Sequence, residues 1–200
     1  MIDRLTEETI AQRIRTNRVQ VVDDNLFPHL RGLQPKKASV LIPLTRIKDE
    51  WFVLFTTRTD KVETHKGQVS FPGGGWEEGD ADPIQTALRE VDEEIGLKPN
   101  DVSVLGFLSE RRTVSNYIVT PVVGVYPTPY SFVESSHEVK RIFMVPLKWL
   151  ANPNHWRSFT YDETNNIVIK YQEFEGEIIW GITAKMMVDL VRTLNVADLS

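Results

Sequence analysis

The feature that most constrains this chain is the run of residues 89–97, in which Arg89 precedes three glutamates, Glu90, Glu93 and Glu94. Side chains three and four positions apart share one face of an α-helix, so these carboxylates converge while the aliphatic residues between them point toward a core. Three like charges this close repel one another unless a cation compensates them. Because hard oxygen ligands suit Mg²⁺ or Mn²⁺, the run predicts a divalent-metal site. The alternative is a solvated acidic helix face.

A glycine-rich segment lies shortly before this acidic run. Residues 71–75 read Phe-Pro-Gly-Gly-Gly, and Pro83 then suits the first turn of the helix that carries the glutamates. Glycine permits a close approach of backbone to a ligand. A phosphate chain, bridged to the helix carboxylates by metal ions, would therefore run along this segment.

Together these segments resemble the signature of the Nudix hydrolases, G-x5-E-x7-R-E-U-x-E-E-x-G-U, where U is a bulky aliphatic residue. Gly74, Asp80 and residues 89–97 follow this pattern. Asp80 replaces the first Glu, and eight residues rather than seven separate it from Arg89. Asp80 and the two glutamates shortly before it, Glu77 and Glu78, all stay open as the acidic partner of that arginine.

The resemblance extends upstream to the coenzyme A diphosphatase branch, whose additional signature reads L-L-T-x-R-[SA]-x3-R-x3-G-x3-F-P-G-G. Residues 54–59 and 67–74 match most of it with the same spacing. Phe55 stands for Leu, Thr59 stands for Ser or Ala, and Glu63 occupies the position of the second arginine. The first two are mild changes of volume, whereas Glu63 reverses a charge that could meet a phosphate. This change of charge affects which substrate is expected and leaves the expected fold unchanged.

The resemblance extends over roughly residues 38–190 and implies an α/β fold (α+β), the Nudix-type α/β/α sandwich with a mixed central β-sheet. It implies an enzyme that uses a divalent metal to hydrolyse a phosphoanhydride in a nucleoside diphosphate derivative. Coenzyme A or acyl-CoA leads as substrate, with 3′,5′-ADP and 4′-phosphopantetheine as products. ADP-ribose, dinucleotides and nucleoside triphosphates stay open, and so does a non-catalytic nucleotide-binding module.

The same resemblance assigns roles to the charged residues. Glu90 and Glu94 are expected to be the primary metal ligands, with Glu93 as a third ligand or one that binds through water. Arg89 is expected to hold the carboxylates by a forked ion pair, because a guanidinium matches carboxylate geometry. The general base is expected to be Glu93 first and Glu138 second.

Four residues are candidates for contact with the substrate: Arg58, His65, Gly73 and Gly74. Arg58 is the best phosphate-binding candidate outside the helix, the alternative being a surface charge at the end of a strand. Gly74 is also expected to offer a backbone carbonyl to a metal. No partner spacing supports His65, His137 or His155 as a base, so a structural role is favoured for lone histidines, with more weight on His65 as a substrate contact because it lies within the coenzyme A signature.

Composition is consistent with one cytoplasmic enzyme domain that acts on a small molecule. The chain of 200 residues is 41% hydrophobic and 26% charged, which suffices to bury a full core. Its formal net charge of −5 argues against a nucleic-acid polymer as partner, and the absence of Cys excludes disulfides and zinc–thiolate sites. Neither a membrane span nor a signal peptide is indicated. A monomer and a homodimer both stay open.

Hydrophobic periodicity predicts where the helices and strands lie. Helices are expected over residues 5–15, 83–95 and 178–194, and strands over 38–44, 51–57, 102–108, 117–126 and 167–174. The segment Lys48-Asp49-Glu50 predicts a hairpin between the first two strands, and Pro146 indicates a strand-to-helix turn. Residues 1–37 are expected to form an N-terminal helix and a connecting segment (19–37) packed on a domain over residues 38–200.

Overall fold

The structure is a computed structural model that describes residues 2–16, 27, 30, 32–60, 66–161 and 166–194. Its helices are α1 (Glu7–Thr16), α2 (Pro83–Ile95), α3 (Leu147–Ala151) and α4 (Gly181–Thr193). Its strands are β1 (Lys36–Ile47), β2 (Glu50–Arg58), β3 (Val69–Ser70), β4 (Gly73–Gly75), β5 (Ser103–Phe107), β6 (Arg111–Arg112), β7 (Tyr117–Val125), β8 (Val139–Pro146), β9 (Trp156–Tyr161) and β10 (Asn166–Tyr171). Short 3₁₀ turns cover Ile2–Arg4, Pro99–Asp101 and Pro153–His155.

Most of these strands form one mixed sheet in the order β3-β2-β1-β7-β5. Strands β1 and β7 run parallel, with Lys36 opposite Tyr117 and Leu44 opposite Val125. The other pairings are antiparallel, and they include β4 on β1, β6 on β7 and β8 on β2. Parallel and antiparallel pairs therefore coexist, which confirms the mixed central sheet.

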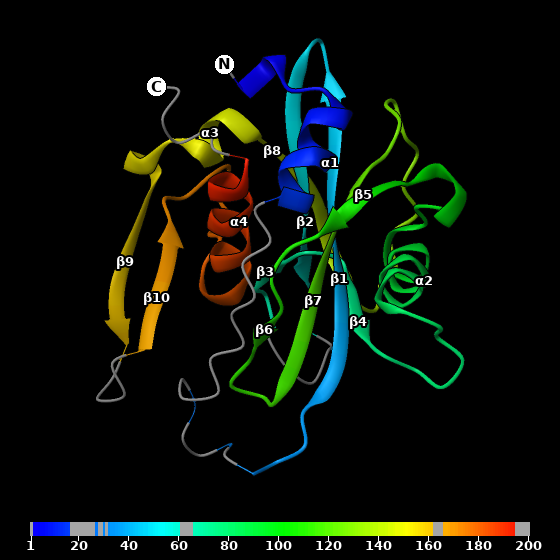
Figure 1. The fold of residues 1–200 in the computed structure, drawn as a ribbon, viewed down its shortest axis with the longest axis vertical. Coiled ribbons are helices and arrows are strands. Elements are labelled where there is room, and N and C mark those ends of the chain that lie inside the picture. The colour runs from blue at the N-terminus through cyan, green and yellow to red at the C-terminus, as the bar shows by residue number, and fades with distance from the viewer. Residues whose placement is uncertain are drawn as a thin grey trace.

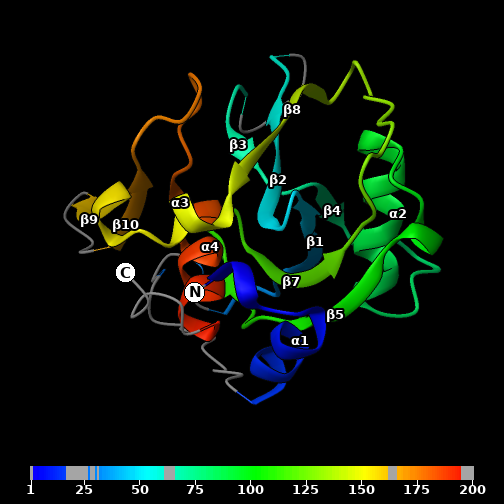
Figure 2. The ribbon, with the colours of Figure 1, turned by 90° about the horizontal axis from the view of Figure 1, so that it is seen from above.

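Neighbouring residues on the central strands face two different cores, because side chains alternate along a strand. Leu41 and Leu54 pack with α2, whereas Ile42 and Phe55 pack with α1 and α4. Figures 1 and 2 show the strands lying between α2 and the pair α1 and α4. The predicted α/β/α sandwich is thus confirmed.

The predicted hairpin forms at Lys48 and Asp49. Ile47 is opposite Glu50, so these two residues make the turn, and their φ angles are 47° and 68°. Positive φ at both central positions is typical of a type I′ turn, whose twist matches that of the flanking strands. Strand β1 itself begins at Lys36, slightly before the predicted start, because it continues its parallel pairing with β7.

Two predicted boundaries near the C-terminal helix were wrong. The strand expected over 167–174 ends at Tyr171, and the helix expected over 178–194 begins at Gly181. Phe174 and Glu177 instead pair with each other across a tight turn, which separates the two elements. Strand β9 has no counterpart in the prediction and pairs with β10 in a separate two-stranded sheet.

The N-terminal helix α1 packs on the sheet beside β5. Ile10 and Ile14 are buried, and Ile14 lies so close to Gly106 that a Cβ there would be 2.8 Å from it. The indole N–H of Trp51 donates to the Leu5 carbonyl at 2.9 Å. Most of the predicted connecting segment lies outside the described residues. Of the described helices, none combines the length and apolarity needed to span a bilayer.

Candidate active site

Both ends of the acidic helix α2 are set by local capping. The Asp82 side chain accepts a hydrogen bond from the Gln85 N–H at 2.9 Å, which satisfies one of the free donors of the first turn. Gly96 ends the helix with a φ of 69°, and its N–H donates to the Asp92 carbonyl at 2.9 Å. The helix predicted over residues 83–95 is confirmed, so its glutamates stand on a rigid element.

One face of α2 is apolar and anchors the helix to the sheet. Ala87, Val91 and Ile95, spaced four residues apart, are fully buried against Leu41 and Leu54. Burial of a valine or isoleucine side chain contributes roughly 1.5–3 kcal/mol, so this contact fixes the position of the acidic face.

Arg89 is the centre of a charge network on α2. Its Nε donates to Asp80 Oδ1 at 3.2 Å, and its Nη2 donates to Asp80 Oδ2 at 3.1 Å and to the Gly75 carbonyl at 3.0 Å. Its Nη1 donates to Glu90 Oε1 at 3.1 Å and to Glu93 Oε2 at 3.3 Å. The forked contact is therefore made with Asp80, and single contacts are made with the two glutamates.

Asp80 is the acid that pairs most closely with Arg89. Glu77 comes only to 4.0 Å and is largely exposed, but its backbone N–H donates to Asp80 Oδ2 at 3.0 Å. The hydrogen bonds from Arg89 lower the pKa of Asp80 to about 2, and Asp80 in turn raises the pKa of the guanidinium. The pair is consequently ionised at neutral pH.

Glu94 is the most deeply buried acid of α2, with a side chain only 4% exposed. Its Oε2 accepts the Gly73 N–H at 3.0 Å, and Arg58 Nη1 lies 3.7 Å from its Oε1. Burial raises the pKa of Glu94 to about 8, outweighing both of these contacts, and the charges of Glu138 and Glu90 add to the rise. A nearby divalent cation would favour the ionised form instead.

Glu90 packs against the glycine segment. A Cβ at Gly74 would lie 2.4 Å from the carboxyl carbon of Glu90, so the absence of a side chain there lets the carboxylate reach β4. The side chain of Glu90 is 15% exposed. Burial raises the pKa of Glu90, while the adjacent Arg89 acts in the opposite direction.

The loop before β8 brings Glu138 to the same acids. The Ser135 N–H donates to the Glu94 carbonyl at 2.8 Å, and the Thr59 N–H donates to the Glu138 carbonyl at 2.9 Å. The charge of Glu138 contributes to the raised pKa of both Glu90 and Glu94. The end of β2, the helix α2 and this loop thus meet around one acidic cluster.

Two further acids of α2 lie away from the buried pair. Glu93 is 60% exposed and turns toward Arg89. Asp92 pairs with Lys98 at 2.6 Å, on the other side of the helix end. The acidic run is therefore divided between a buried pair, Glu90 and Glu94, and acids that face solvent.

The histidines have different surroundings. His137 is exposed in the loop before β8. His155 packs in the turn before β9, where its Nδ1 lies 2.9 Å from the Trp149 carbonyl and its ring lies 4.5 Å from the indole. These contacts hold the His155 ring against Trp149 and agree with a structural role. His65 and Glu63 lie outside the described residues.

Two contacts at the site were not anticipated from the sequence. The Gly75 carbonyl accepts from Arg89, and its place in the glycine run could have indicated this. The Thr59 hydroxyl donates to the His137 carbonyl at 2.5 Å, across 78 residues of sequence. That contact depends on how β2 meets the loop before β8, so no local pattern signals it.

Glu90 and Glu94 are the carboxylates best placed to hold a divalent cation. Among the described residues, no three acidic or imidazole side chains are grouped closely enough to hold a metal ion, and the carboxylates of Glu90 and Glu94 accept hydrogen bonds from Arg89 and the Gly73 N–H. Both acids nevertheless offer hard oxygen donors, and burial makes both carboxylates unfavourable without a compensating cation. The donor set fits Mg²⁺ or Mn²⁺.

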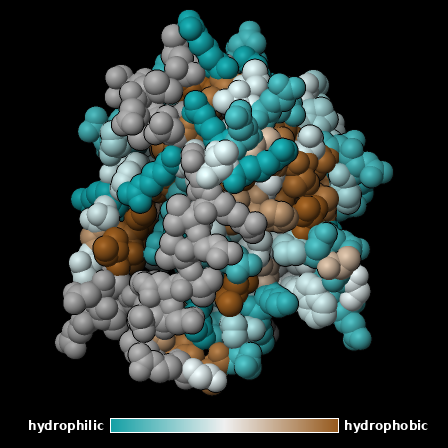
Figure 3. Space-filling model, viewed as in Figure 1, coloured by the Kyte–Doolittle hydropathy of each residue, from teal (hydrophilic) through white to brown (hydrophobic). Residues whose placement is uncertain are grey.

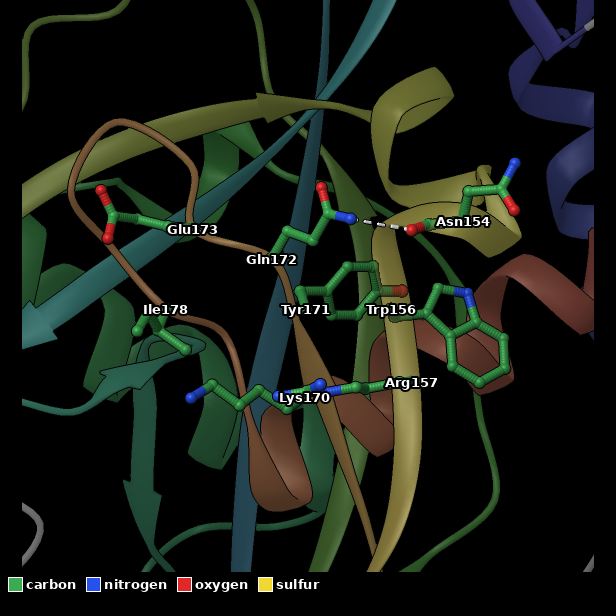
Figure 4. Close-up of a pocket in the computed structure, with 8 residues that line it drawn as sticks. All are labelled: Asn154, Trp156, Arg157, Lys170, Tyr171, Gln172, Glu173 and Ile178. Atoms are coloured by element: carbon green, nitrogen blue, oxygen red, sulfur yellow. Dashed lines mark hydrogen bonds between the residues drawn. The ribbon is translucent and has the colours of Figure 1, made fainter.

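A separate cavity of about 360 Å³ opens at the β9–β10 hairpin. It is lined by Asn154, Trp156, Arg157, Lys170, Tyr171, Gln172, Glu173 and Ile178. Figure 4 shows these side chains, with the Gln172 amide donating to the Asn154 carbonyl at 3.0 Å. Figures 1 and 2 show the hairpin on the opposite side of the molecule from α2. The cavity is therefore distinct from the acidic cluster.

Comparisons with known proteins agree with this arrangement. A family model described as the NUDIX domain matches residues 35–165. Two proteins named "Uncharacterized Nudix hydrolase NudL", from Yersinia pestis (strain Pestoides F) and Yersinia pseudotuberculosis serotype O:1b (strain IP 31758), are each 32% identical over 200 residues, covering 98% of this chain and 100% of the relative. The crystal structure of a MutT/nudix family protein from Enterococcus faecalis shares the fold, with a TM-score of 0.54 at 12% identity over 97% of this chain and 75% of that one. The matched family model and the full-length relatives show that this chain is an enzyme of the Nudix hydrolase family.

Proposed function

We propose that this Nudix hydrolase cleaves the phosphoanhydride of a nucleoside diphosphate derivative, with coenzyme A or acyl-CoA as its preferred substrate. The products would be 3′,5′-ADP and 4′-phosphopantetheine or its acyl form. The observation that carries the proposal is the position of Arg58, a partly exposed cation 3.7 Å from the buried carboxyl of Glu94.

Arg58 has hydrogen-bonding capacity that its protein neighbours do not use. Its Nη1 is 3.7 Å from Glu94, which is too long for a hydrogen bond. Its Nε is buried and has no hydrogen-bond partner within the described part of the chain. Because the Arg58 side chain is 25% exposed, its guanidinium is open to a phosphate oxygen of the substrate, with which a cation makes strong hydrogen bonds.

The choice of coenzyme A rests on the segments that carry the additional signature. The Arg58 N–H donates to the Gln68 carbonyl at 3.0 Å, and the Gly67 N–H donates back to the Arg58 carbonyl at 3.2 Å. The chain then continues through β3 to Gly73, whose N–H reaches Glu94. These hydrogen bonds join the described signature segments to each other and to Glu94. They support a shared role of both segments in substrate binding.

We propose that Mg²⁺ or Mn²⁺ is held by Glu90 and Glu94, with Glu93 as a third ligand or one that binds through water. When bound, the divalent ion supplies charge neutralisation to the diphosphate and lowers the pKa of a coordinated water. Arg89, anchored by Asp80, keeps Glu90 oriented toward β4. Both buried acids would then be ionised.

Glu138 is proposed as the general base in preference to Glu93. Glu138 is partly shielded from solvent, and its loop is hydrogen-bonded to the Glu94 carbonyl through Ser135, which supports a place for it beside the buried pair. Glu93 is 60% exposed and its Oε2 accepts a hydrogen bond from Arg89 at 3.3 Å, so it is turned away from the buried pair.

The remaining substrate contacts are proposed from the sequence. Gly73 and Gly74 would line the diphosphate with backbone atoms, and His65, in the segment between β2 and β3, would contact the substrate from the coenzyme A signature. The cytoplasmic location, the oligomeric state and the division near residue 38 stay predictions.

Parallel assays test the substrate. Purified protein with Mg²⁺ or Mn²⁺ is offered coenzyme A, ADP-ribose and NADH, and the products are separated by chromatography. We expect 3′,5′-ADP to form from coenzyme A with the highest kcat/KM. Preferential turnover of ADP-ribose would reject coenzyme A while keeping the hydrolase, and nucleotide binding with no turnover would favour a non-catalytic module.

A further inference from the structure

Thr59 holds the loop that carries the proposed base. It follows Arg58 at the end of β2, and its side chain is buried. Its backbone N–H donates to the Glu138 carbonyl at 2.9 Å, and its hydroxyl donates to the His137 carbonyl at 2.5 Å. One residue therefore binds two consecutive carbonyls immediately before β8.

The same loop is tied to the acidic helix on its other side. The Ser135 N–H donates to the Glu94 carbonyl at 2.8 Å, and the Ser135 carbonyl accepts from the N–H groups of Glu138 at 3.0 Å and Val139 at 2.8 Å. The loop thus spans the space between the helix that carries Glu94 and the strand that carries Arg58.

The restraint on this loop acts on Glu138 directly, because its own carbonyl accepts the Thr59 N–H. The loop that carries Glu138 is hydrogen-bonded to the Glu94 carbonyl through Ser135. Arg58, the neighbour of Thr59, lies 3.7 Å from the Glu94 carboxylate. Like charges drive the side chain outward, so a carboxylate that must stay near two others needs a rigid backbone. The hydrogen bonds from Thr59 supply that restraint on the β2 side.

We propose that the Thr59 hydroxyl is a positioning group, which holds Glu138 over the buried glutamate pair by fixing the carbonyl of the preceding residue. The inference rests on the proposed function, in which Glu138 accepts a proton from the attacking water. It also gives a chemical meaning to position 59, where the coenzyme A signature has Ser or Ala. A serine would keep the donor, whereas an alanine would leave the backbone N–H contact alone.

Two substitutions separate the hydroxyl from the volume of the side chain. Thr59→Val keeps the shape and loses the donor, and Thr59→Ser keeps the donor and loses a methyl group. We expect Thr59→Val to lower kcat by about 10- to 100-fold, because small displacements of a catalytic group have effects of that size, with KM changed by less than about twofold. Thr59→Ser should retain kcat within about threefold of the wild type.

A double-mutant cycle tests whether the effect passes through Glu138. In a Glu138→Gln background, Thr59→Val should lower kcat no further, since the group that it positions is already gone. Losses that multiply in the double variant would overturn the proposal. Equal losses for Thr59→Val and Thr59→Ser would do the same, because they would point to packing rather than to the hydroxyl.

Amide hydrogen exchange gives a readout that needs neither metal nor substrate. Exchange at residues 135–139 should accelerate in Thr59→Val and stay at the wild-type rate in Thr59→Ser. Wild-type rates in both variants would overturn the restraint. If the wild-type protein hydrolyses none of the offered substrates, the proposed function fails, and the exchange comparison alone then decides whether the hydroxyl holds the loop.

Discussion

Arg89 donates two hydrogen bonds to the carboxylate of Asp80, from Nε to Oδ1 at 3.2 Å and from Nη2 to Oδ2 at 3.1 Å. The same Nη2 reaches the Gly75 carbonyl, and Nη1 reaches Glu90. Asp80 and Arg89 therefore connect the loop before α2, the strand β4 and the acidic face of the helix. Through this pair, a contact remote from the substrate orients a carboxylate that is proposed to bind metal.

Asp80→Asn should destabilise the fold without changing its shape. The amide keeps the volume of the side chain but loses a buried, charge-assisted contact, which lowers the free energy of unfolding by about 1.5–3 kcal/mol. Urea unfolding followed by circular dichroism at about pH 6 measures the difference. Glu78→Gln, an exposed acid in the same loop, is the matched control and should leave stability unchanged.

The same pair predicts an acid dependence of stability. Arg89 lowers the pKa of Asp80 from 3.8 to about 2, so the folded state favours the ionised carboxyl. This contribution is complete above the unfolded pKa and disappears as the pH falls from about 4 to about 2. The advantage of the wild type over Asp80→Asn should therefore shrink over that interval. A constant advantage from about pH 6 to about pH 3 would contradict the assignment.

Glu94→Gln should abolish turnover while leaving the protein folded. Glu94 is proposed as a charged ligand of a divalent ion that stabilises the transition state, and its loss should lower kcat by at least about 100-fold. Asp92→Asn is the control on the same helix, because Asp92 pairs with Lys98 and faces away from the site, and it should keep kcat within about twofold. Similar losses in both variants would mean that the helix itself, and not Glu94, had been disturbed.

The raised pKa of Glu94 predicts how stability responds to pH without divalent ions. Burial raises this pKa from 4.5 to about 8, so the unfolded chain ionises first and the folded state is penalised increasingly between these values. In a chelator, Glu94→Gln should thus gain stability relative to the wild type as the pH rises from about 5 to about 8. Thermal unfolding across this range measures the gain, and added Mn²⁺ should reduce it by binding the wild type alone.

Gly74→Ala and Gly75→Ala form a matched pair that tests the approach of Glu90 to β4. A Cβ at Gly74 would lie 2.4 Å from the Glu90 carboxyl carbon, whereas a Cβ at Gly75 would meet no atom within 4 Å. We expect Gly74→Ala to lower kcat at least about tenfold by displacing Glu90, and Gly75→Ala to keep most of the activity. Equal activity of the two variants would show that the position of Glu90 matters little.

The elements that the sequence predicts well are those whose signals are local. Pro83 marks the first turn of α2 within the segment itself, and the predicted bounds of that helix agree with the structure. The hairpin at Lys48 and Asp49 is similar, because alternating apolar runs lie on both sides of a short polar break.

The contacts that bring the site residues together could not be predicted from the sequence. Arg58 meets Glu94, and Thr59 meets His137, only because β2 lies beside both α2 and the loop before β8. The partner of Arg89 was equally open, since several acids share one loop and their side-chain directions depend on its folded path. Long-range packing, which has no local signature, decides these relationships.

Arg58→Gln should weaken substrate binding more than it disturbs the fold. The substitution removes a cation that is 25% exposed beside Glu94, so the loss falls on the phosphate that it is proposed to contact. We expect KM for the preferred substrate to rise at least about tenfold, since charge-assisted contacts to phosphate are about twice as strong as neutral ones. Arg46→Gln is the control, because Arg46 pairs with Asp49 at the hairpin turn and is 41% exposed. Steady-state kinetics and thermal unfolding of both variants separate the two effects. An unchanged KM in Arg58→Gln would remove this arginine from the substrate site, whereas a loss of folding would show that its pairing with Glu94 is structural.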